Sequence, residues 1–213
     1  MPIVHGVSAS PFVRKVRVAL AEKGVDYELN PVMPIGQNPE YLRKSPLGKI
    51  PCYEDGEFVL PDSSCILAYL ERTHPTPPLY PADPKQYGRA LFYEEYSDSK
   101  LSETLGSVFF QRFIQPQIFK KEPDEKVCRE KLETARGLFD YLEGELADRE
   151  YLAGGRFSVA DIAVGSIFVN FAHAGEKVDA KRWPRLAAYL GRIHARPSFK
   201  ALIEEERQSF GLG

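Results

Sequence analysis

The chain of 213 residues has few cysteines, no long apolar run and almost no net charge. Its cysteines, Cys52, Cys65 and Cys128, are odd in number and lack CxxC or Cys/His spacing, so they indicate neither a disulfide framework nor a metal site. We interpret them as buried thiols in a reducing compartment. No apolar run approaches the ~18 residues of a membrane span, and no charged leader precedes an apolar segment at the N-terminus. These absences predict a soluble, cytoplasmic protein without a membrane or metal partner.

A basic region is also absent. Lys and Arg number 28 against 30 Asp and Glu, which leaves a net charge of −2. The balance holds in both parts of the chain, with 8 basic and 9 acidic side chains in residues 1–78 and 20 and 21 in the remainder. Since no region could neutralise a row of phosphates, we do not expect nucleic acid as a principal partner. The length allows one large domain or two small ones with a sizeable core.

The first third of the chain alternates short β-rich runs with helical patterns, in the order β-α-β-α-β-β-α. Asp55-Gly56 marks a two-residue hairpin turn between the last two strands. With parallel strands first and a hairpin last, this order predicts a four-stranded sheet with helices. The expected strands are Ile3–Gly6, Asp26–Pro31, Pro51–Tyr53 and Phe58–Leu60, and the expected helices span residues 12–23, 39–44 and 63–72.

A proline-rich segment then divides the chain. Residues 74–84 hold five of the 17 prolines, and such a segment cannot continue a helix, so it forms a stiff linker. We therefore expect a first domain over residues 1–78, a linker over 79–85 and a second domain over 86–213. Almost all of the second domain has a helical pattern, with helices expected over residues 86–115, 124–146, 159–174, 184–195 and 198–208.

The hairpin and the helix that follows it carry the clearest functional indication. Pro51 cannot donate to a sheet ladder, so it must begin or border its strand, and Lys49 and Ile50 just before it should lie at a sheet edge. Opposite them, Asp62-Ser63 opens a helix whose unpaired N–H groups favour an anion. A cation, an open backbone edge, a carboxylate and a helix N-terminus together suit a small zwitterionic peptide.

This arrangement resembles the glutathione site of the cytosolic glutathione S-transferase family, and the resemblance extends over nearly the whole chain. It implies a thioredoxin-like first domain and an all-helical second domain. In the family the proline that matches Pro51 is cis, and the backbone before it, Ile50 here, pairs with the cysteinyl part of glutathione. The resemblance also implies that Asp62 and Ser63 hold the γ-glutamyl end and that Lys49 meets the glycyl carboxylate.

Ser10 is the residue that we expect to stabilise the glutathione thiolate. The thiolate is the nucleophilic form, whereas an unperturbed thiol has a pKa of about 8.5. A hydroxyl at a helix N-terminus favours the anion through its hydrogen bond and through the helix dipole. Ser10 precedes Arg14 by four residues, a spacing found in the serine-type delta and phi classes, which are related to the theta, zeta and bacterial enzymes. Ser8 is the alternative, because the zeta class carries tandem serines here.

Simpler interpretations compete with these roles. Ser10 could be only the N-cap of its helix, and Asp62 only the cap of the next one. Arg14, Lys15 and Arg17 could form a solvated helix face, which is the usual fate of charge runs.

Ser158 and Asp161 form the pattern of a capping box, with a hydrophobic staple between Phe157 and Ile162. In the family this pair begins the helix at the heart of the second domain, so its expected role is structural. A group of aromatic residues follows the linker, where the family binds its hydrophobic co-substrate, although aromatic residues at helical spacing more often belong to a core. That group is Tyr93, Tyr96, Phe109, Phe110 and Phe113.

The resemblance implies an enzyme, a glutathione S-transferase in which the thiolate of glutathione attacks a hydrophobic electrophile, as in detoxification. It implies glutathione as co-substrate, no metal, and a homodimer. Among enzymes, the alternative is a glutathione-dependent isomerase of the zeta type or a reductase of peroxides or disulfides. The alternative from another class is a non-catalytic module with the same fold that carries ligands or partners.

Overall fold

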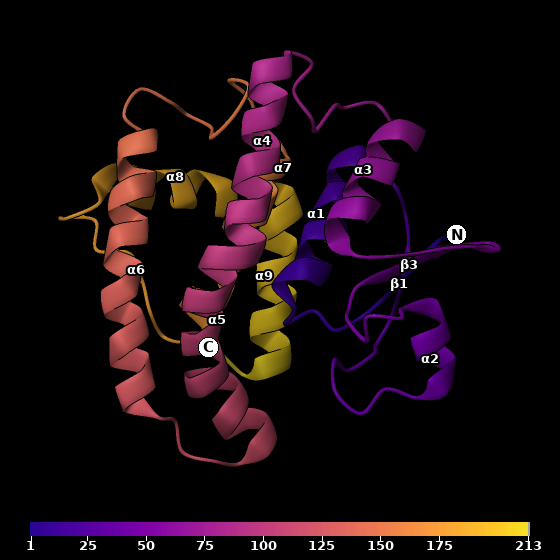
Figure 1. Ribbon diagram of the computed structural model, residues 1–213, viewed down its shortest axis with the longest axis horizontal. Coiled ribbons are helices and arrows are strands. Elements are labelled where there is room, and N and C mark those ends of the chain that lie inside the picture. Colours follow the sequence, from indigo (N-terminus) through magenta and orange to yellow (C-terminus); the bar gives the residue numbers. More distant parts are fainter. Residues whose placement is uncertain (213) are drawn as a thin grey trace.

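The structure is a computed structural model, and it describes residues 1–212. Its first domain is a four-stranded mixed sheet with the strand order β2-β1-β3-β4. Figure 1 shows α1 and α3 above this sheet and α2 below it. The expected order of strands and helices is confirmed. The strands are β1 (Ile3–His5), β2 (Glu28–Asn30), β3 (Cys52–Asp55) and β4 (Phe58–Pro61), and the helices are α1 (Pro11–Lys23), α2 (Pro39–Lys44) and α3 (Ser63–Thr73).

The hairpin turn lies one residue later than the sequence predicted. β3 and β4 pair as far as Asp55 opposite Phe58, so the two loop residues are Gly56 and Glu57 rather than Asp55 and Gly56. Gly56 takes a φ of 61°, which glycine adopts at no steric cost. Asp55 is therefore the last residue of β3 and pairs with Phe58, instead of being part of the turn.

The second domain is all-helical, as expected. The single long helix predicted over residues 86–115 is instead a succession of α-helical and π-helical segments. The chain leaves α4 through a π-helical stretch, returns to α-helix and passes through a second π-helical stretch that contains Pro116. Proline breaks the regular ladder because it lacks an N–H. The segments are α4 (Pro84–Tyr96), η1 (Ser97–Leu101), α5 (Ser102–Phe109), η2 (Phe110–Phe119), α6 (Glu125–Glu145), α7 (Val159–His173), α8 (Pro184–His194) and α9 (Pro197–Phe210).

The central helix of this domain is α7. All of its residues except Ala172 are buried, which is the behaviour of a helix that is apolar on every side. It packs against α1, α4, α5 and α8. Within residues 1–212, no helix combines the length and the apolar character that crossing a membrane requires.

Helix α1 lies between the two domains, with α3 on one side and α7 and α9 on the other (Figure 1). Its cations are therefore not a solvated face, because Arg14, Lys15 and Arg17 are only 0%, 1% and 6% exposed. Each cation forms an ion pair with a carboxylate of the second domain, and these pairs are Arg14–Glu206, Lys15–Asp98 and Arg17–Glu205.

The start of α7 is held by the expected capping box of Ser158 and Asp161. Oδ2 of Asp161 accepts from the Ser158 N–H at 2.9 Å and from its hydroxyl at 3.0 Å. Oδ1 accepts from the Leu152 N–H at 3.0 Å and from the Tyr189 hydroxyl at 2.9 Å. Burial, only partly offset by these hydrogen bonds, raises the pKa of Asp161 to about 6. Asp161 is thus more than a cap, because it also joins the preceding loop and α8 to α7.

We expect Asp161→Asn to remove a pH dependence of folding stability. A carboxyl whose pKa is higher in the folded than in the unfolded protein binds protons on folding, so the native protein should lose stability as the pH rises from about 4 to above 6. Asn cannot ionise, so the variant should not lose this stability. Between pH 4 and pH 6 and above, the unfolding free energy of the variant should therefore rise relative to that of the native protein by about 1–3 kcal/mol. Urea unfolding at several pH values measures this difference. A constant difference would show that the carboxyl titrates normally.

Candidate functional site

The segments that carry the predicted site residues meet at one end of the sheet, where three paired residues on neighbouring strands lie side by side. His5 of β1 lies opposite Cys52 of β3, and Cys52 lies opposite Pro61 of β4. β1 therefore leads into α1, and β4 leads into α3, at the same end of the sheet at which Pro51 enters β3. Because both helices begin at this end, their unpaired N–H groups and positive dipole ends make it attractive to an anion.

Ser10 caps the first of these helices, as expected. Its Oγ accepts from the Val13 N–H at 3.4 Å, while its backbone carbonyl accepts from the Arg14 N–H at 2.9 Å. The Ser10 N–H donates to the Val7 carbonyl at 3.0 Å, so the loop before the helix is closed by its own backbone. Within residues 1–212 the hydroxyl hydrogen of Ser10 has no acceptor, and the side chain is half-buried.

Ser8, the alternative, is already engaged on both sides. Its hydroxyl donates to Glu205 Oε1 at 2.9 Å and accepts from Arg17 Nη1 at 2.9 Å. The Arg17 guanidinium also makes two direct bonds to the Glu205 carboxylate, at 2.9 and 2.7 Å. Ser8 is therefore part of an ion-pair network between α1 and α9.

Ile50 lies directly beside the start of α1. A Cβ on Gly6 would stand 2.4 Å from Cγ2 of Val13 and 3.4 Å from Cβ of Ile50, so only glycine allows these segments to approach this closely. The peptide bond between Ile50 and Pro51 is cis, as expected. Within residues 1–212 neither the N–H nor the C=O of Ile50 has a backbone partner.

The expectation that Lys49 and Ile50 lie at a sheet edge is wrong. β3 is an inner strand, paired with β1 on one side and with β4 on the other. The Ile50 backbone is open because pairing begins only at Cys52, so the segment lies beyond the end of the sheet. The consequence for a ligand is the same, since an extended peptide could still pair with the unpartnered groups of Ile50.

Lys49 is fixed through its backbone and not through its side chain. Its carbonyl accepts from the Tyr41 hydroxyl and from the Ser45 hydroxyl, both at 2.8 Å. The side chain is exposed, and within residues 1–212 its ammonium group forms no ion pair. The cation is therefore available to a carboxylate on a ligand.

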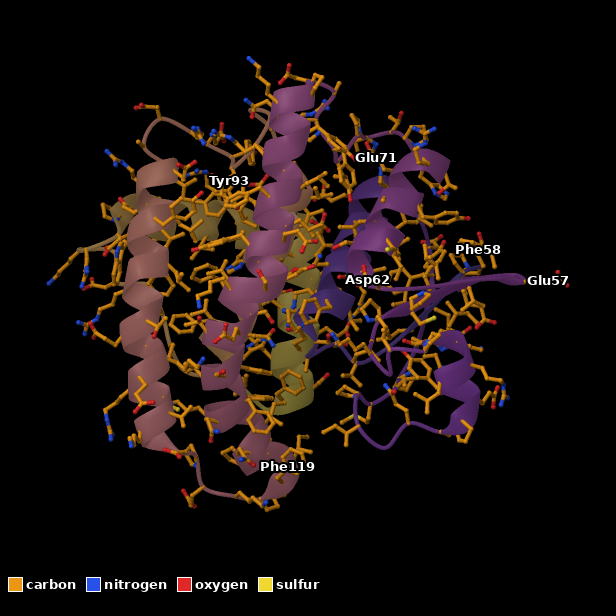
Figure 2. All side chains as sticks on the ribbon, in the orientation of Figure 1. Glu57, Phe58, Asp62, Glu71, Tyr93 and Phe119 are labelled. Carbon is orange, nitrogen blue, oxygen red and sulfur yellow. The ribbon has the colours of Figure 1, made fainter. Side chains whose placement is uncertain are left out.

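Asp62 caps α3 and keeps its carboxylate exposed. Oδ1 accepts from the N–H groups of Ser64 at 3.0 Å and Cys65 at 3.1 Å. The residue takes a φ of 78°, a backbone conformation that is uncommon for a residue with a side chain. Figure 2 shows Asp62 at the lower end of α3, far from Phe58 and Glu57 at the outer end of the hairpin. Ser63 follows as the first residue of the helix and is buried.

A buried lysine holds the start of α3 in place. Lys15 Nζ lies 3.2 Å from Ser64 Oγ, 2.6 Å from Asp98 Oδ2 and 3.1 Å from Glu94 Oε1. Burial alone would disfavour the charged amine, but the two carboxylates outweigh it and raise the pKa of Lys15. The lysine thus stays charged and connects α1, the first turn of α3 and the second domain.

The cysteine in this region does not look like a nucleophile. Cys65 is exposed rather than buried, which corrects the expectation from the sequence, while Cys52 and Cys128 are buried as expected. Burial of the sulfur and the neighbouring Asp62 raise the pKa of the Cys65 thiol. A raised pKa disfavours the thiolate, which is the nucleophilic form, so Cys65 is a weak nucleophile near neutral pH.

The five aromatic residues proposed for an electrophile site do not gather at one place. Tyr93 is only 1% exposed and donates to Glu145 at 2.5 Å, and Figure 2 shows it between α4 and α6. Tyr96 packs on Phe92 and Tyr141, with ring centroids 5.9 and 5.3 Å away. Phe110 lies against Phe119, at the far lower end of the helical domain in Figure 2. The five residues therefore do not form a single cluster; Tyr93 is buried away from any ligand, and a place for Tyr96 and Phe110 in an electrophile site stays a prediction.

Phe109 and Phe113 do lie beside the candidate loop. Their rings stack with centroids 4.9 Å apart, and Phe210 from the end of α9 meets Phe113 at 4.8 Å. Ala9 packs against the same apolar cluster. An apolar wall thus adjoins the residue that precedes Ser10, and Phe210 belongs to it although the sequence analysis did not single it out.

Both parts of the chain match known protein domains. Residues 4–78 match the glutathione S-transferase N-terminal domain, and residues 102–197 match the glutathione S-transferase C-terminal domain. The probable glutathione S-transferase GSTF2 of Oryza sativa subsp. japonica is 30% identical over 200 residues, which is 92% of each chain. Glutathione S-transferase theta-2B of Homo sapiens is 33% identical over 187 residues, 85% of this chain and 76% of the human one.

Solved structures agree with these matches. The theta class glutathione S-transferase of Xanthomonas axonopodis pv. citri, solved with glutathione bound, superposes with a TM-score of 0.83 at 27% identity. The superposition covers 95% of this chain and 96% of the other. The chain therefore belongs to the glutathione S-transferase family, whose members are enzymes with glutathione as co-substrate.

Several residues that shape this site carry no signal in the sequence. Asn170 of α7 donates to the Ala9 carbonyl at 2.9 Å, and Glu206 of α9 binds Arg14. His173, to which the sequence analysis gave no role, lies 2.8 Å from Glu206. These contacts join residues more than 30 positions apart in the chain, so no local pattern could have revealed them.

We expect Asp62→Asn to separate the capping role of Asp62 from a role in binding. Asn caps helices about as well as Asp, so the unfolding free energy should change by less than about 0.5 kcal/mol. Loss of a charged partner for the amino group of glutathione should weaken binding by about 1.5–3 kcal/mol, roughly ten- to hundredfold. Calorimetric titration with glutathione and thermal unfolding measure the two effects. Unchanged affinity would leave Asp62 as a cap only.

Proposed function

We propose that this glutathione transferase activates the sulfur of glutathione through the hydroxyl of Ser10. The observation that carries the proposal is the different state of the two serines. A hydroxyl can donate one hydrogen bond. The Ser8 hydroxyl donates to Glu205, whereas the Ser10 hydroxyl has no acceptor within residues 1–212. Ser10 is therefore the residue that can donate to a sulfur anion at the start of α1.

The other candidate residues would hold the ends of the tripeptide. Lys49 offers an unpaired ammonium group to the glycyl carboxylate, and the open backbone of Ile50 can pair with the cysteinyl residue. Asp62 and Ser63 at the start of α3 would receive the γ-glutamyl end. This assignment is supported by their common position at one end of the sheet, beside the start of α1. It makes residues 1–78 the glutathione-binding unit and residues 86–213 the unit that supplies the second substrate's surface.

The reaction would be an attack of the thiolate on an electrophilic carbon, in which a C–S bond forms and the leaving group or the neighbouring atom takes the electron pair. The apolar wall beside Ala9 supports a hydrophobic electrophile, which would meet Phe210, the half-buried member, because Phe109 and Phe113 are themselves buried. Ser10 lowers the barrier by stabilising the thiolate and by positioning it toward that wall. A detoxifying role in the cytoplasm fits this chemistry and the unpaired state of the three cysteines.

We expect Ser10→Ala to slow conjugation while it leaves glutathione affinity largely intact. Losing a charge-assisted hydrogen bond of about 1.5–3 kcal/mol should raise the pKa of the bound thiol by one to two units. The rate near neutral pH should then fall roughly ten- to hundredfold. The ultraviolet absorbance of the thiolate, titrated against pH with glutathione bound, measures the shift directly.

Ser8→Ala is the matched control and should move this titration much less. A shift with Ser8→Ala alone would transfer the role to Ser8. If glutathione binds to the native protein with an unshifted thiol pKa, the chain is a non-catalytic ligand-binding module.

We also propose a homodimer that forms through the exposed face of α4. Tyr87, Leu91 and Phe92 on this helix are 42%, 37% and 50% exposed, which is unusual for large apolar side chains that lie close together. Pairing of two such faces would remove them from water.

We expect light scattering to give twice the chain mass of 24.0 kDa for the native protein and the single-chain mass for Phe92→Glu. Ile118→Glu, at a side chain that is 51% exposed at the other end of the helical domain, should leave the dimer intact. A native protein that elutes as a single chain would contradict the proposal.

A further inference from the structure

The peptide bond between Ala9 and Ser10 is held from both sides by hydrogen bonds. Its N–H donates to the Val7 carbonyl at 3.0 Å, and its carbonyl accepts from Nδ2 of Asn170 at 2.9 Å. The orientation of this peptide plane decides where Cβ of Ser10 points, and hence where its hydroxyl lies. Asn170 belongs to the second domain and is only 2% exposed, so it contacts the loop from the protein interior.

The Asn170 side chain is itself oriented by Arg14. The guanidinium donates to Oδ1 of Asn170 at 2.7 Å. A guanidinium can only donate, so the amide oxygen must face it and the amide nitrogen must face Ala9. The Arg14 N–H also donates to the Ser10 carbonyl at 2.9 Å, which closes a ring of contacts through Ala9, Ser10, Arg14 and Asn170.

Arg14 in turn is fixed by α7 and α9. Its Nε and Nη2 donate to the two oxygens of Glu206 at 2.8 and 2.6 Å, and Nη1 also donates to the Ser166 carbonyl at 2.7 Å. Both side chains of the Arg14–Glu206 pair are fully buried. This bidentate geometry leaves the guanidinium a single orientation, so the Asn170 amide has no freedom to turn.

We propose that Asn170 is a positioning residue for thiol activation, holding the Ala9–Ser10 peptide so that the Ser10 hydroxyl points at the glutathione sulfur. The proposal rests on the role proposed for Ser10 above. Arg14 and Glu206 act one step further back, because they orient the Asn170 amide. A hydrogen bond weakens steeply when its angle departs from linear, and small misplacements of reacting groups lower rates strongly.

A purely structural Asn170 would behave differently. In that case its removal would lower the melting temperature of the protein without changing the titration of bound glutathione. The test therefore compares Asn170→Ala with Val164→Ala, which deletes a buried apolar side chain from the same helix; Val164 belongs to the main core cluster, whereas Ala9 packs against the smaller one.

The experiment is a double-mutant cycle read by the ultraviolet thiolate titration of bound glutathione. Asn170→Ala should raise the pKa of the bound thiol by about half a unit to one unit and lower kcat about three- to tenfold, with the KM for glutathione within about twofold. Val164→Ala should melt earlier but titrate as the native protein does. In a Ser10→Ala background, Asn170→Ala should produce no further shift, because its effect passes through the serine.

Three results would overturn the proposal. If Ser10→Ala shifts the titration and Asn170→Ala does not, Asn170 is structural while the role of Ser10 stands. If the two shifts simply add, Asn170 acts on the sulfur independently of Ser10. If Asn170→Ala shifts the titration and Ser10→Ala does not, both the positioning role and the proposed role of Ser10 fail.

Asn170→Asp covers the case in which the alanine variant does not fold. Aspartate keeps an oxygen for Arg14 but cannot donate to the Ala9 carbonyl. The added negative charge of aspartate shifts the pKa of the bound thiol equally with and without the Ser10 hydroxyl. The double-mutant cycle therefore removes this contribution from the coupling between the two positions. A coupling between positions 170 and 10 supports the proposal, and strict additivity contradicts it.

Discussion

Three cations on a single buried helix decide how the two domains meet. An ionised side chain taken out of water costs several kcal/mol unless a partner compensates it. Arg14, Lys15 and Arg17 on α1 all receive carboxylates from the second domain, and two of these, Glu205 and Glu206, are neighbours on the last helix. The cations of α1 therefore have all their ion-pair partners only when α9 has packed against α1. The apolar area between the domains adds stability, but the charges define the one orientation in which α1 can be buried.

This constraint carries directly to the site. Both helices that begin at the site are held from the second domain: α1 through Arg14 and Arg17, and the first turn of α3 through the Ser64 hydroxyl, which donates to Asp98 at 3.2 Å. Ser8 is drawn into the ion pair of Arg17 and Glu205, which leaves Ser10 as the hydroxyl that can serve a ligand. The difference in hydrogen bonding between the two serines thus follows from the packing of α9, which supplies Glu205 to Ser8.

Features that depend on a few neighbouring residues could be predicted from the sequence. The helix caps formed by Ser10, by Asp62 and by the pair of Ser158 and Asp161 are as expected, because their hydrogen bonds close within one turn. The hairpin turn was misplaced by one residue, since Asp55 is the last paired residue of β3 and not part of the turn. Burial of the α1 cations could not be predicted, because their carboxylates lie between 79 and 192 positions away in the chain. The aromatic group does not form one cluster because its members pack against different partners: Tyr96 against Tyr141, Phe110 against Phe119, and Phe113 against Phe210.

The central claim is that the start of α1, held by the second domain, presents Ser10 to the sulfur of a glutathione bound across the ends of β3 and α3. A crystal structure of the protein with glutathione tests it most directly. We expect the sulfur within hydrogen-bonding distance of Ser10 Oγ, about 3.0–3.5 Å, with the cysteinyl backbone paired to Ile50 and the γ-glutamyl end at Asp62 and Ser63. A sulfur that instead lies beside Ser8, with the Arg17–Glu205 pair opened to admit it, would contradict the account.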